Sequence, residues 1–269
     1  NTLNIIAKKL AEKKFASGAI RFNSEEFKFE LDENGVPIAI HKKPHLETHS
    51  LVEDFMLLAN RYVAKFIYDR CEDSNGNCSL MYRVHNVPDK DKISELAVFA
   101  KALGYTLNIN KDGVVTAKDL NSLFAQVSGK NEESLITTAA IRTMAKAIYS
   151  TENSGHFGLA FEYYTHFTSP IRRYPDLVVH RIMAKLIAGE SISDVDAIFF
   201  QKVANHASTQ EVAAQEAERA SIKYKQTEFM MNHVGEEFEG IISGVAPFGL
   251  FVILNDTGAE GMIHISKLG

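Results

Sequence analysis

The chain is poor in the residues that mark secreted, fibrous and membrane proteins. Its 269 residues include 2 cysteines, 6 prolines and no tryptophan. With 45% hydrophobic residues and so little proline, disorder, a collagen-like repeat and a disulfide scaffold are excluded. No apolar run approaches the roughly 18 residues of a membrane helix, and the first residues lack the apolar core of a signal peptide. The sequence predicts an ordered soluble protein with no membrane partner and, by default, a cytoplasmic location.

The two cysteines are Cys71 and Cys78, and six polar or glycine residues separate them. This spacing fits no common zinc pattern, and a reducing compartment disfavours a disulfide. We expect two reduced thiols and assign no chemistry to them.

Positive charge is also scarce. The net charge is -5, so the basic surplus typical of a small nucleic-acid-binding domain is lacking. Positions 234 to 269 hold five acids and one base, Lys267, so much of the acidity lies at this end. Any site for a nucleic acid must therefore be local.

Hydrophobic periodicity predicts a mainly helical first part with a short β meander. A helix begins near Leu3 and stops at Gly18, and alternating residues then predict strands over 19–22, 27–31 and 36–40. Further elements are expected as a helix over 51–67, a strand over 80–85, helices over 90–103, 117–127 and 132–149, and a long helix from about 193 to 231. This order indicates an α+β fold class.

The helix over 51–67 carries two apolar stripes and a narrow polar face. Glu53 and Asn60 share that polar face. We expect this helix to be buried on most sides, which makes a solvated carboxylate at Glu53 the less favoured interpretation.

At Val234 the pattern changes from helical to β, and glycines punctuate short alternating segments. We therefore place one domain over 1–233 and the start of a second over 234–269. The second has too few strands to close a barrel. Together with the absence of an initiator methionine, this indicates a piece of a larger protein.

The most unusual stretch is GHFGLAFEYYTHFTSPIRRYPDLVVHR, residues 155–181. Ser169 and Pro170 form a good N-cap and N1 pair, which predicts Ile171 to Tyr174 in a first helical turn. The free N–H groups of that turn and the guanidinium groups of Arg172 and Arg173 could bind a phosphate, and the aromatic rings nearby could stack on bases. Pro175 predicts a kink or break after Tyr174. The alternative, that both arginines pair with Asp176 or other acids and the aromatics are core, is equally compatible with the composition.

HFGLAFEYYTHFTSPIRRYPDLVVHR resembles the signature of the RNase II/RNase R family of processive 3′ to 5′ exoribonucleases, and RRYPDL resembles its RNase R branch. LVEDFMLLAN at 51–60 and SGAIRFNSEEFKFEL at 17–31 are similar to that family in the same order. The resemblance implies that 1–233 is the C-terminal part of the catalytic domain. It implies that 234–269 is an incomplete S1-type OB-fold β-barrel.

The resemblance also implies roles for individual residues. Arg172 would contact the scissile phosphate, where a guanidinium stabilises developing negative charge. Glu53 would orient the 3′-terminal nucleotide, and Glu218 would lie close to it, although a helical ion pair is an equally good account of Glu218. Ser169, Arg173 and Tyr174 would belong to the same RNA-binding turn.

Aromatic contacts to RNA are implied at both ends of the chain. Phe22 matches an aromatic that stacks on a base near the 3′ end, although an aromatic on a short strand is more often core. Phe248, Phe251 and His264 match the surface residues with which S1-type folds hold single-stranded RNA.

The family hydrolyses RNA with two Mg²⁺ ions held by aspartates in a D-x5-D-x-D-D pattern, which this sequence lacks. Asp194 and Asp196 are better explained as charge at the start of a helix that Ser193 caps. We therefore assign no metal ligand in this chain and expect the metal ligands upstream of it.

The larger protein is expected to be a monomer that acts on single-stranded RNA and on the 3′ ends of structured RNA. This piece alone is expected to be inactive, and the alternatives are a non-catalytic RNA-binding module or a scaffold.

Overall fold

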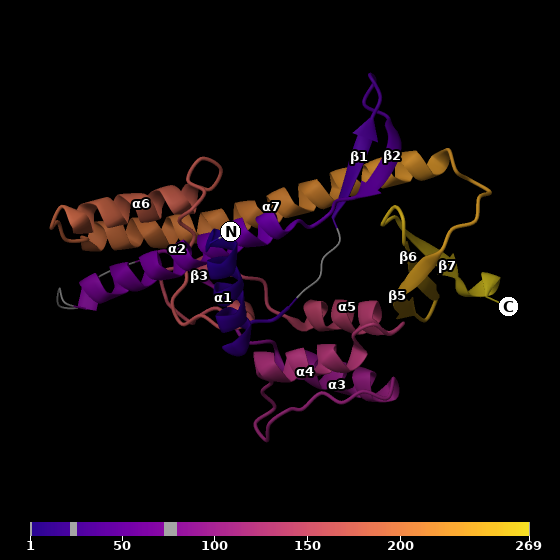
Figure 1. Ribbon diagram of the computed structural model, residues 1–269, viewed down its shortest axis with the longest axis horizontal. Coiled ribbons are helices and arrows are strands. Elements are labelled where there is room, and N and C mark those ends of the chain that lie inside the picture. The colour runs from indigo at the N-terminus through magenta and orange to yellow at the C-terminus, as the bar shows by residue number, and fades with distance from the viewer. Residues whose placement is uncertain (1, 22–25, 73–79, 269) are drawn as a thin grey trace.

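The computed structural model describes residues 2–21, 26–72 and 80–268. In chain order the elements are α1 (Thr2–Ala16), β1 (Phe27–Leu31), β2 (Pro37–Lys42), α2 (Glu47–Glu72), β3 (Tyr82–Val84), α3 (Lys90–Ala102), α4 (Ala117–Val127), α5 (Glu133–Thr143), β4 (Ile148–Ser150), η1 (Phe157–Leu159), α6 (Tyr174–Ile187), α7 (Asp194–Met231), β5 (Gly240–Ala246), β6 (Gly249–Leu254), β7 (Glu260–His264) and η2 (Ile265–Lys267). Helices with small antiparallel sheets make an α+β fold, as expected (Figure 1). No described helix combines the length and apolar character needed to cross a membrane.

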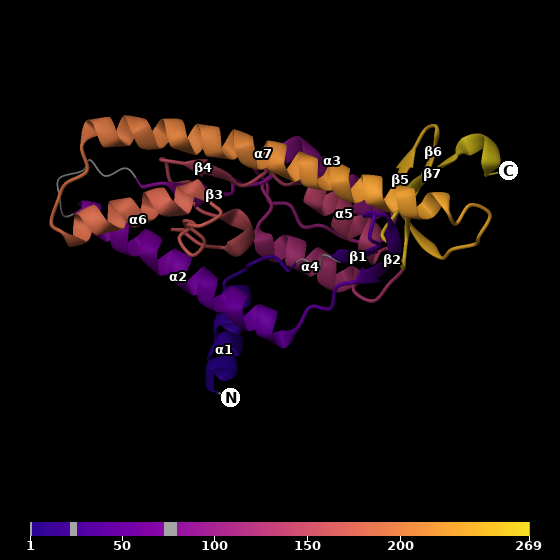
Figure 2. The ribbon, with the colours of Figure 1, turned by 90° about the horizontal axis from the view of Figure 1, so that it is seen from above.

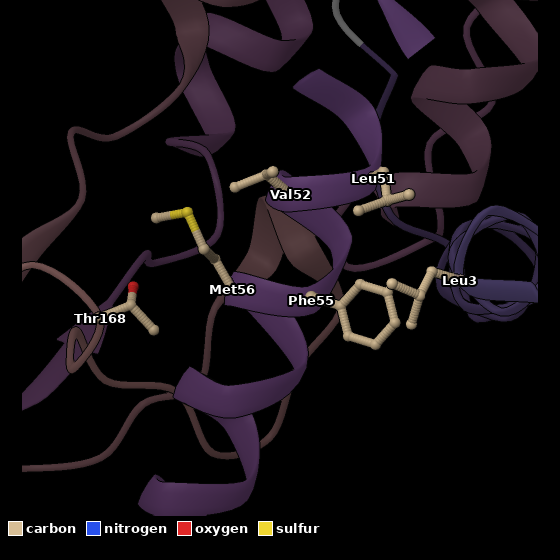
Figure 3. A pocket seen from close by; sticks show the side chains of 6 residues that line it. All are labelled: Leu3, Leu51, Val52, Phe55, Met56 and Thr168. Carbon is tan, nitrogen blue, oxygen red and sulfur yellow. The ribbon is translucent and has the colours of Figure 1, made fainter. Parts of the chain in front are cut away.

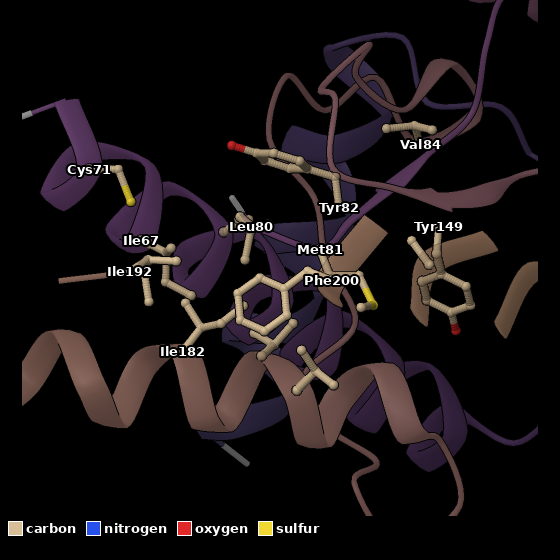
Figure 4. Close-up of a cluster of buried hydrophobic side chains, with 14 residues drawn as sticks. Ile67, Cys71, Leu80, Met81, Tyr82, Val84, Tyr149, Ile182, Ile192 and Phe200 are labelled. Carbon is tan, nitrogen blue, oxygen red and sulfur yellow. The ribbon is translucent and has the colours of Figure 1, made fainter. Parts of the chain in front are cut away.

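One core lies between α2, α6 and the first part of α7. Side chains from these helices and from β3 and β4 meet in a single cluster (Figure 4). Ile67 of α2 and Ile182 of α6 are fully buried in it, beside Met81. Burial of such a side chain stabilises the fold by about 1.5–3 kcal/mol. This core therefore fixes α6 and the loop that enters it.

A second core joins α3, α4 and α5. Ile20, from the loop after α1, lies in it with Leu120, Leu123 and Ile136. A reciprocal pair of hydrogen bonds between Thr116 and Asp119 caps α4, which begins and ends where the sequence predicts.

Helix α7 runs along most of the length of the molecule, and the last sheet lies beyond its C-terminal end (Figure 2). The predicted cap is confirmed, since Ser193 and Asp196 exchange side-chain and backbone hydrogen bonds at its start. The Lys185 ammonium binds Asp196 at 2.9 Å and, as the largest cause, lowers the pKa of that carboxyl to about 2. Asp196 therefore serves the start of α7, as expected.

The last three strands form an antiparallel sheet in the order β5-β6-β7, and the described residues form no closed barrel. A β-bulge between Ile242 and Gly244 shifts the β5–β6 register. The β6–β7 loop packs on the rest of the chain, because Gln226 of α7 donates to the Thr257 carbonyl at 3.1 Å and Gly258 lies against the Phe27 ring of β1.

Two element predictions are wrong. Residues 19–21 are not a strand, because Ile20 is buried in the second core and its N–H donates to the Gly158 carbonyl. The predicted three-stranded meander is therefore a two-stranded hairpin of β1 and β2. The helix predicted over 132–149 ends at Thr143, since Met144 is extended and 148–150 pair with β3 as β4.

Two further expectations are corrected. Helix α2 is not buried on most sides: Val52 and Tyr62 are 53% and 66% exposed, because α1, α6 and the residues around β3 pack on its other faces. Cys71 is disulfide-bonded, so the expectation of a reduced thiol is wrong there, and Cys78 lies outside the described residues.

Candidate functional site

The loop before α6 is held by one buried carboxylate. Asp176, in the first turn of α6, is 0% exposed, and its Oδ2 accepts from the Ser169 N–H at 2.7 Å and from the Arg173 Nη2 at 2.9 Å. A negative charge in this position also suits the positive end of the helix. The alternative interpretation of the signature is thus correct for Arg173, which pairs with Asp176.

The predicted helix start at Ser169 is wrong. Residues 170–172 form a single turn, in which the Ser169 carbonyl accepts from Arg173 N–H at 3.0 Å, and α6 begins only at Tyr174. Pro175 explains the difference, because it lacks the N–H that a helix continued from Ser169 would need. The expected break therefore falls just before Tyr174 instead of after it. In the described part of the chain Arg172 makes no ion pair, so its guanidinium is available.

A groove of about 920 Å³ between the start of α6 and the middle of α7 brings four predicted residues together. Arg172, Arg173 and Tyr174 line one side, and Glu218 lies on the α7 side. Its other polar lining residues are Tyr149, Lys202, His206, Gln210, Glu211 and Gln215. Cations and an exposed aromatic at one wall are groups that suit a phosphate and a base.

A buried polar network supports the floor of this groove. The Arg83 guanidinium binds both carboxylate oxygens of Glu211, at 2.5 and 3.0 Å, and lies over the Tyr149 ring at 4.6 Å from its centroid. The Tyr149 hydroxyl is 2.9 Å from Nδ1 of His166. The charge of Glu211 is thus already engaged by Arg83 on the inner side of the groove.

His166, which contacts Tyr149, and His156, which contacts Tyr164, are kept neutral. Burial, reinforced by the charges of Arg173 and Arg83, lowers the pKa of His166 to about 2. Burial lowers the pKa of His156 to about 3, and the neighbouring His85 adds to the shift. Burial also raises the pKa of Tyr149 to about 12. Near neutral pH His166, His156 and Tyr149 are therefore uncharged, and the positive charge of the groove comes from Arg172, Arg173 and Lys202.

Glu53 lies in a neighbouring part of the surface. Its side chain is 58% exposed and 3.8 Å from the Lys14 Nζ, which binds Asp54 more closely at 2.8 Å. Glu53 lines a cavity of about 360 Å³ with Arg173, so Arg173 borders both this cavity and the α6–α7 groove.

A cavity of about 1010 Å³ also includes Glu53, with Ile20 and Arg21 on its other side. Phe22, the predicted stacking aromatic, lies outside the described residues. The site is therefore described only up to Arg21 at this point, and the role of Phe22 stays a prediction.

An apolar cavity of about 430 Å³ lies on the exposed stripe of α2 (Figure 3). It is lined by Leu3, Leu51, Val52, Phe55, Met56 and Thr168. Without a charged side chain it offers nothing to an anionic ligand, and none of the predicted site residues lines it.

The predicted aromatic face of the last sheet is assembled as expected from the register. Gly249 of β6 pairs with His264, and Phe251 two residues on faces the same side. Phe248, in the β5–β6 turn, is 51% exposed, with its ring centroid 6.2 Å from that of Phe251. We call Phe248, Phe251 and His264 the aromatic face.

The described residues contain no group of three or more His, Cys, Asp or Glu side chains that could hold a metal ion. The Mg²⁺ implied by the family resemblance does not fit any carboxylates described here.

Comparison with known proteins decides the family. The RNB domain model matches residues 1–189, and the S1 RNA binding domain model matches residues 232–269. The chain belongs to the RNB family.

Its relatives include Ribonuclease R of Aquifex aeolicus, 39% identical over 96% of this chain, and Ribonuclease R 1 of Lactococcus lactis, 40% identical over 93%. This chain spans 36% and 30% of their lengths. Mycoplasma genitalium RNase R, solved with ribose methylated single-stranded RNA, matches with a TM-score of 0.88 at 27% identity, over 98% of this chain and 41% of that one. Yeast Ssd1, a pseudonuclease, shares the fold with a TM-score of 0.71 at 21% identity, over 98% of this chain and 32% of that one.

The sequence analysis of this RNB chain did not identify the buried polar network beneath the groove, which consists of Arg83, Tyr149, His166 and Glu211. Tyr149 and Arg83 lie on short strands without any local motif, and Glu211 is one of many acids on α7. Only His166 carried a signal, since it stands inside the signature. A buried arginine needs a carboxylate partner, but sequence spacing does not say which one.

Proposed function

We propose that this chain is the RNA-holding part of a processive 3′ to 5′ exoribonuclease that hydrolyses RNA to nucleoside 5′-monophosphates. The observation that carries the proposal is the α6–α7 groove, in which Arg172, Arg173, Tyr174 and Glu218 meet in a chain of the RNB family. We place the boundary between its two domains at 233/234, just beyond the end of α7.

In this proposal Arg172 contacts the scissile phosphate. Cleavage places negative charge on the phosphoryl oxygens, and a positioned guanidinium stabilises that charge more in the transition state than in the bound RNA. The salt bridge of Arg173 to Asp176 and the Ser169 turn hold Arg172 in place. Glu218 and Glu53 orient the terminal nucleotide, and Tyr174 and Phe22 offer faces for bases.

The cofactor and setting of the larger protein are part of the same proposal. Mg²⁺ would be held by residues outside this chain, because the described carboxylates do not form a metal site. We propose a cytoplasmic monomer that takes single-stranded RNA and the 3′ ends of structured RNA, and that this piece alone does not cleave. The second candidate is a non-catalytic RNA-binding module, with which the described residues are equally compatible.

RNA binding tests what this chain carries by itself. In a fluorescence anisotropy titration with labelled single-stranded RNA, we expect Arg172→Ala to weaken binding about 3- to 10-fold and to flatten its salt dependence. Arg181→Ala is the matched control, since Arg181 is an exposed arginine of α6 that does not line the groove. Equal affinities for both variants and the parent chain would contradict the placement of RNA in this groove.

A further inference from the structure

The aromatic face has stacking groups but almost no positive charge of its own. Residues 234–269 carry five acids and a single base, Lys267. Single-stranded RNA binding normally combines aromatic stacking with cations that follow the phosphates. Within this chain, most cations that could serve this face therefore lie outside residues 234–269.

Helix α5 brings an arginine to the edge of this face. Arg142 lies in the last turn of α5, is exposed, and has no hydrogen bond or ion pair among the described residues. Helix α5 contacts β5, and the two lie next to each other in both overall views (Figures 1 and 2).

Gly244 marks the point where the arginine reaches the sheet. A Cβ placed on Gly244 would lie 3.5 Å from Cδ2 of Phe251 and 3.9 Å from Nη1 of Arg142. Gly244 pairs with Phe251 directly after the bulge, so it faces the same side as the aromatic ring. The guanidinium and the ring therefore lie next to the same position, which has no side chain of its own.

Glu260, an acid on this sheet, does not pair with Arg142 in the described structure. Glu260 of β7 accepts from the Ser243 hydroxyl at 2.8 Å, and no ion pair joins it to Arg142 in the described structure. An unpaired cation beside an aromatic ring is the combination of groups with which proteins hold single-stranded RNA.

We propose that Arg142 is an RNA-binding residue: it contacts a phosphate of the single-stranded RNA whose bases stack on the aromatic face. The site spans both family domains, with the cation supplied by the RNB part and the rings by the S1 part. This inference rests on the proposed RNA-binding function and assigns to it a residue outside the signature.

The test is anisotropy of a labelled single-stranded RNA of 20 nucleotides with the 269-residue chain at several salt concentrations. We expect Arg142→Gln to weaken binding about 3- to 10-fold and to reduce the slope of log affinity against log salt by about 0.7, the value for one lost phosphate contact. Arg142→Lys should recover part of both. Arg181→Gln, an exposed arginine on the distant α6, should change neither.

The variant Phe251→Ala and the parent chain distinguish a failure of this inference from a failure of the proposed function. If Phe251→Ala weakens binding while Arg142→Gln behaves like Arg181→Gln, the inference on Arg142 is wrong and the proposed function stands. If the parent chain and every variant fail to bind RNA, the proposed function itself fails. A loss of affinity in Arg142→Gln with an unchanged salt slope would show a structural role for Arg142 and would also overturn the inference.

Discussion

At the scale of single residues, Asp176 determines how the signature is presented. Its buried carboxylate ties Ser169 and Arg173 together, while its Oδ1 and the Arg173 Nε have no partner in the described structure. This leaves Arg172 as the outward-facing arginine of the pair. The signature thus serves both interpretations that its composition allowed: one arginine is structural and the other is free to bind.

Loss of this carboxylate should be costly. We expect Asp176→Ala to lower the free energy of unfolding by about 3 kcal/mol, because it leaves Arg173 and the Ser169 N–H buried without their partner. Urea denaturation measures the change. Glu26→Gln is the control, since its pair with Lys43 is largely exposed and should cost less than about 1 kcal/mol. Similar costs for the two variants would contradict the structural role of Asp176.

The buried histidines should make stability depend on pH. The folded-state pKa values of His166 and His156 are about 2 and about 3, well below the unfolded value near 6.5. The stability that the two neutral histidines contribute is therefore fully present above about pH 6.5 and is lost as the pH falls from there towards the folded-state pKa values. Between pH 6.5 and 5 each should remove about 2 kcal/mol from the free energy of unfolding. Urea titrations at both pH values test this, and His166→Gln should show the smaller loss. An equal loss in parent and variant would mean that His166 is not the titrating group.

At the scale of elements, packing overrode the local pattern where the sequence prediction failed. The α4 and α7 starts were predictable, because capping pairs such as Ser193 and Asp196 act within one turn. The end of α5 was not, because residues 148–150 gain strand partners from β3, which lies far away in the sequence. The groove was predictable only through the family resemblance, since nothing local links Arg172 to Glu218.

The contact of the last sheet with β1 gives a prediction at this scale. Gly258 has a φ of +65°, and a Cβ there would lie 2.3 Å from the Phe27 ring. We expect Gly258→Ala to cost about 1–3 kcal/mol and to loosen the β6–β7 loop, seen as faster amide hydrogen exchange in β7. Gly261→Ala is the matched control, because nothing lies within 4 Å of that Cβ. Unchanged exchange in Gly258→Ala would show that this contact does not hold the sheet.

At the scale of the whole molecule, the chain spans about a third of the curated relatives it matches. It contains the α6–α7 groove, the buried polar network beneath that groove and the aromatic face, but no metal site among the described residues. We propose that these parts bind and orient RNA. The chemistry of cleavage would need carboxylates from the remainder of the protein.

The most direct test of this account incubates 5′-labelled single-stranded RNA with the 269-residue chain and with a version extended by the upstream part of its own protein, in Mg²⁺ and in EDTA. We predict stepwise shortening only by the extended version in Mg²⁺, and a loss of about 10²–10³ in its rate on Arg172→Lys with a much smaller change in RNA affinity. Shortening by the 269-residue chain alone, or an extended version that binds RNA without cutting it, would contradict the account.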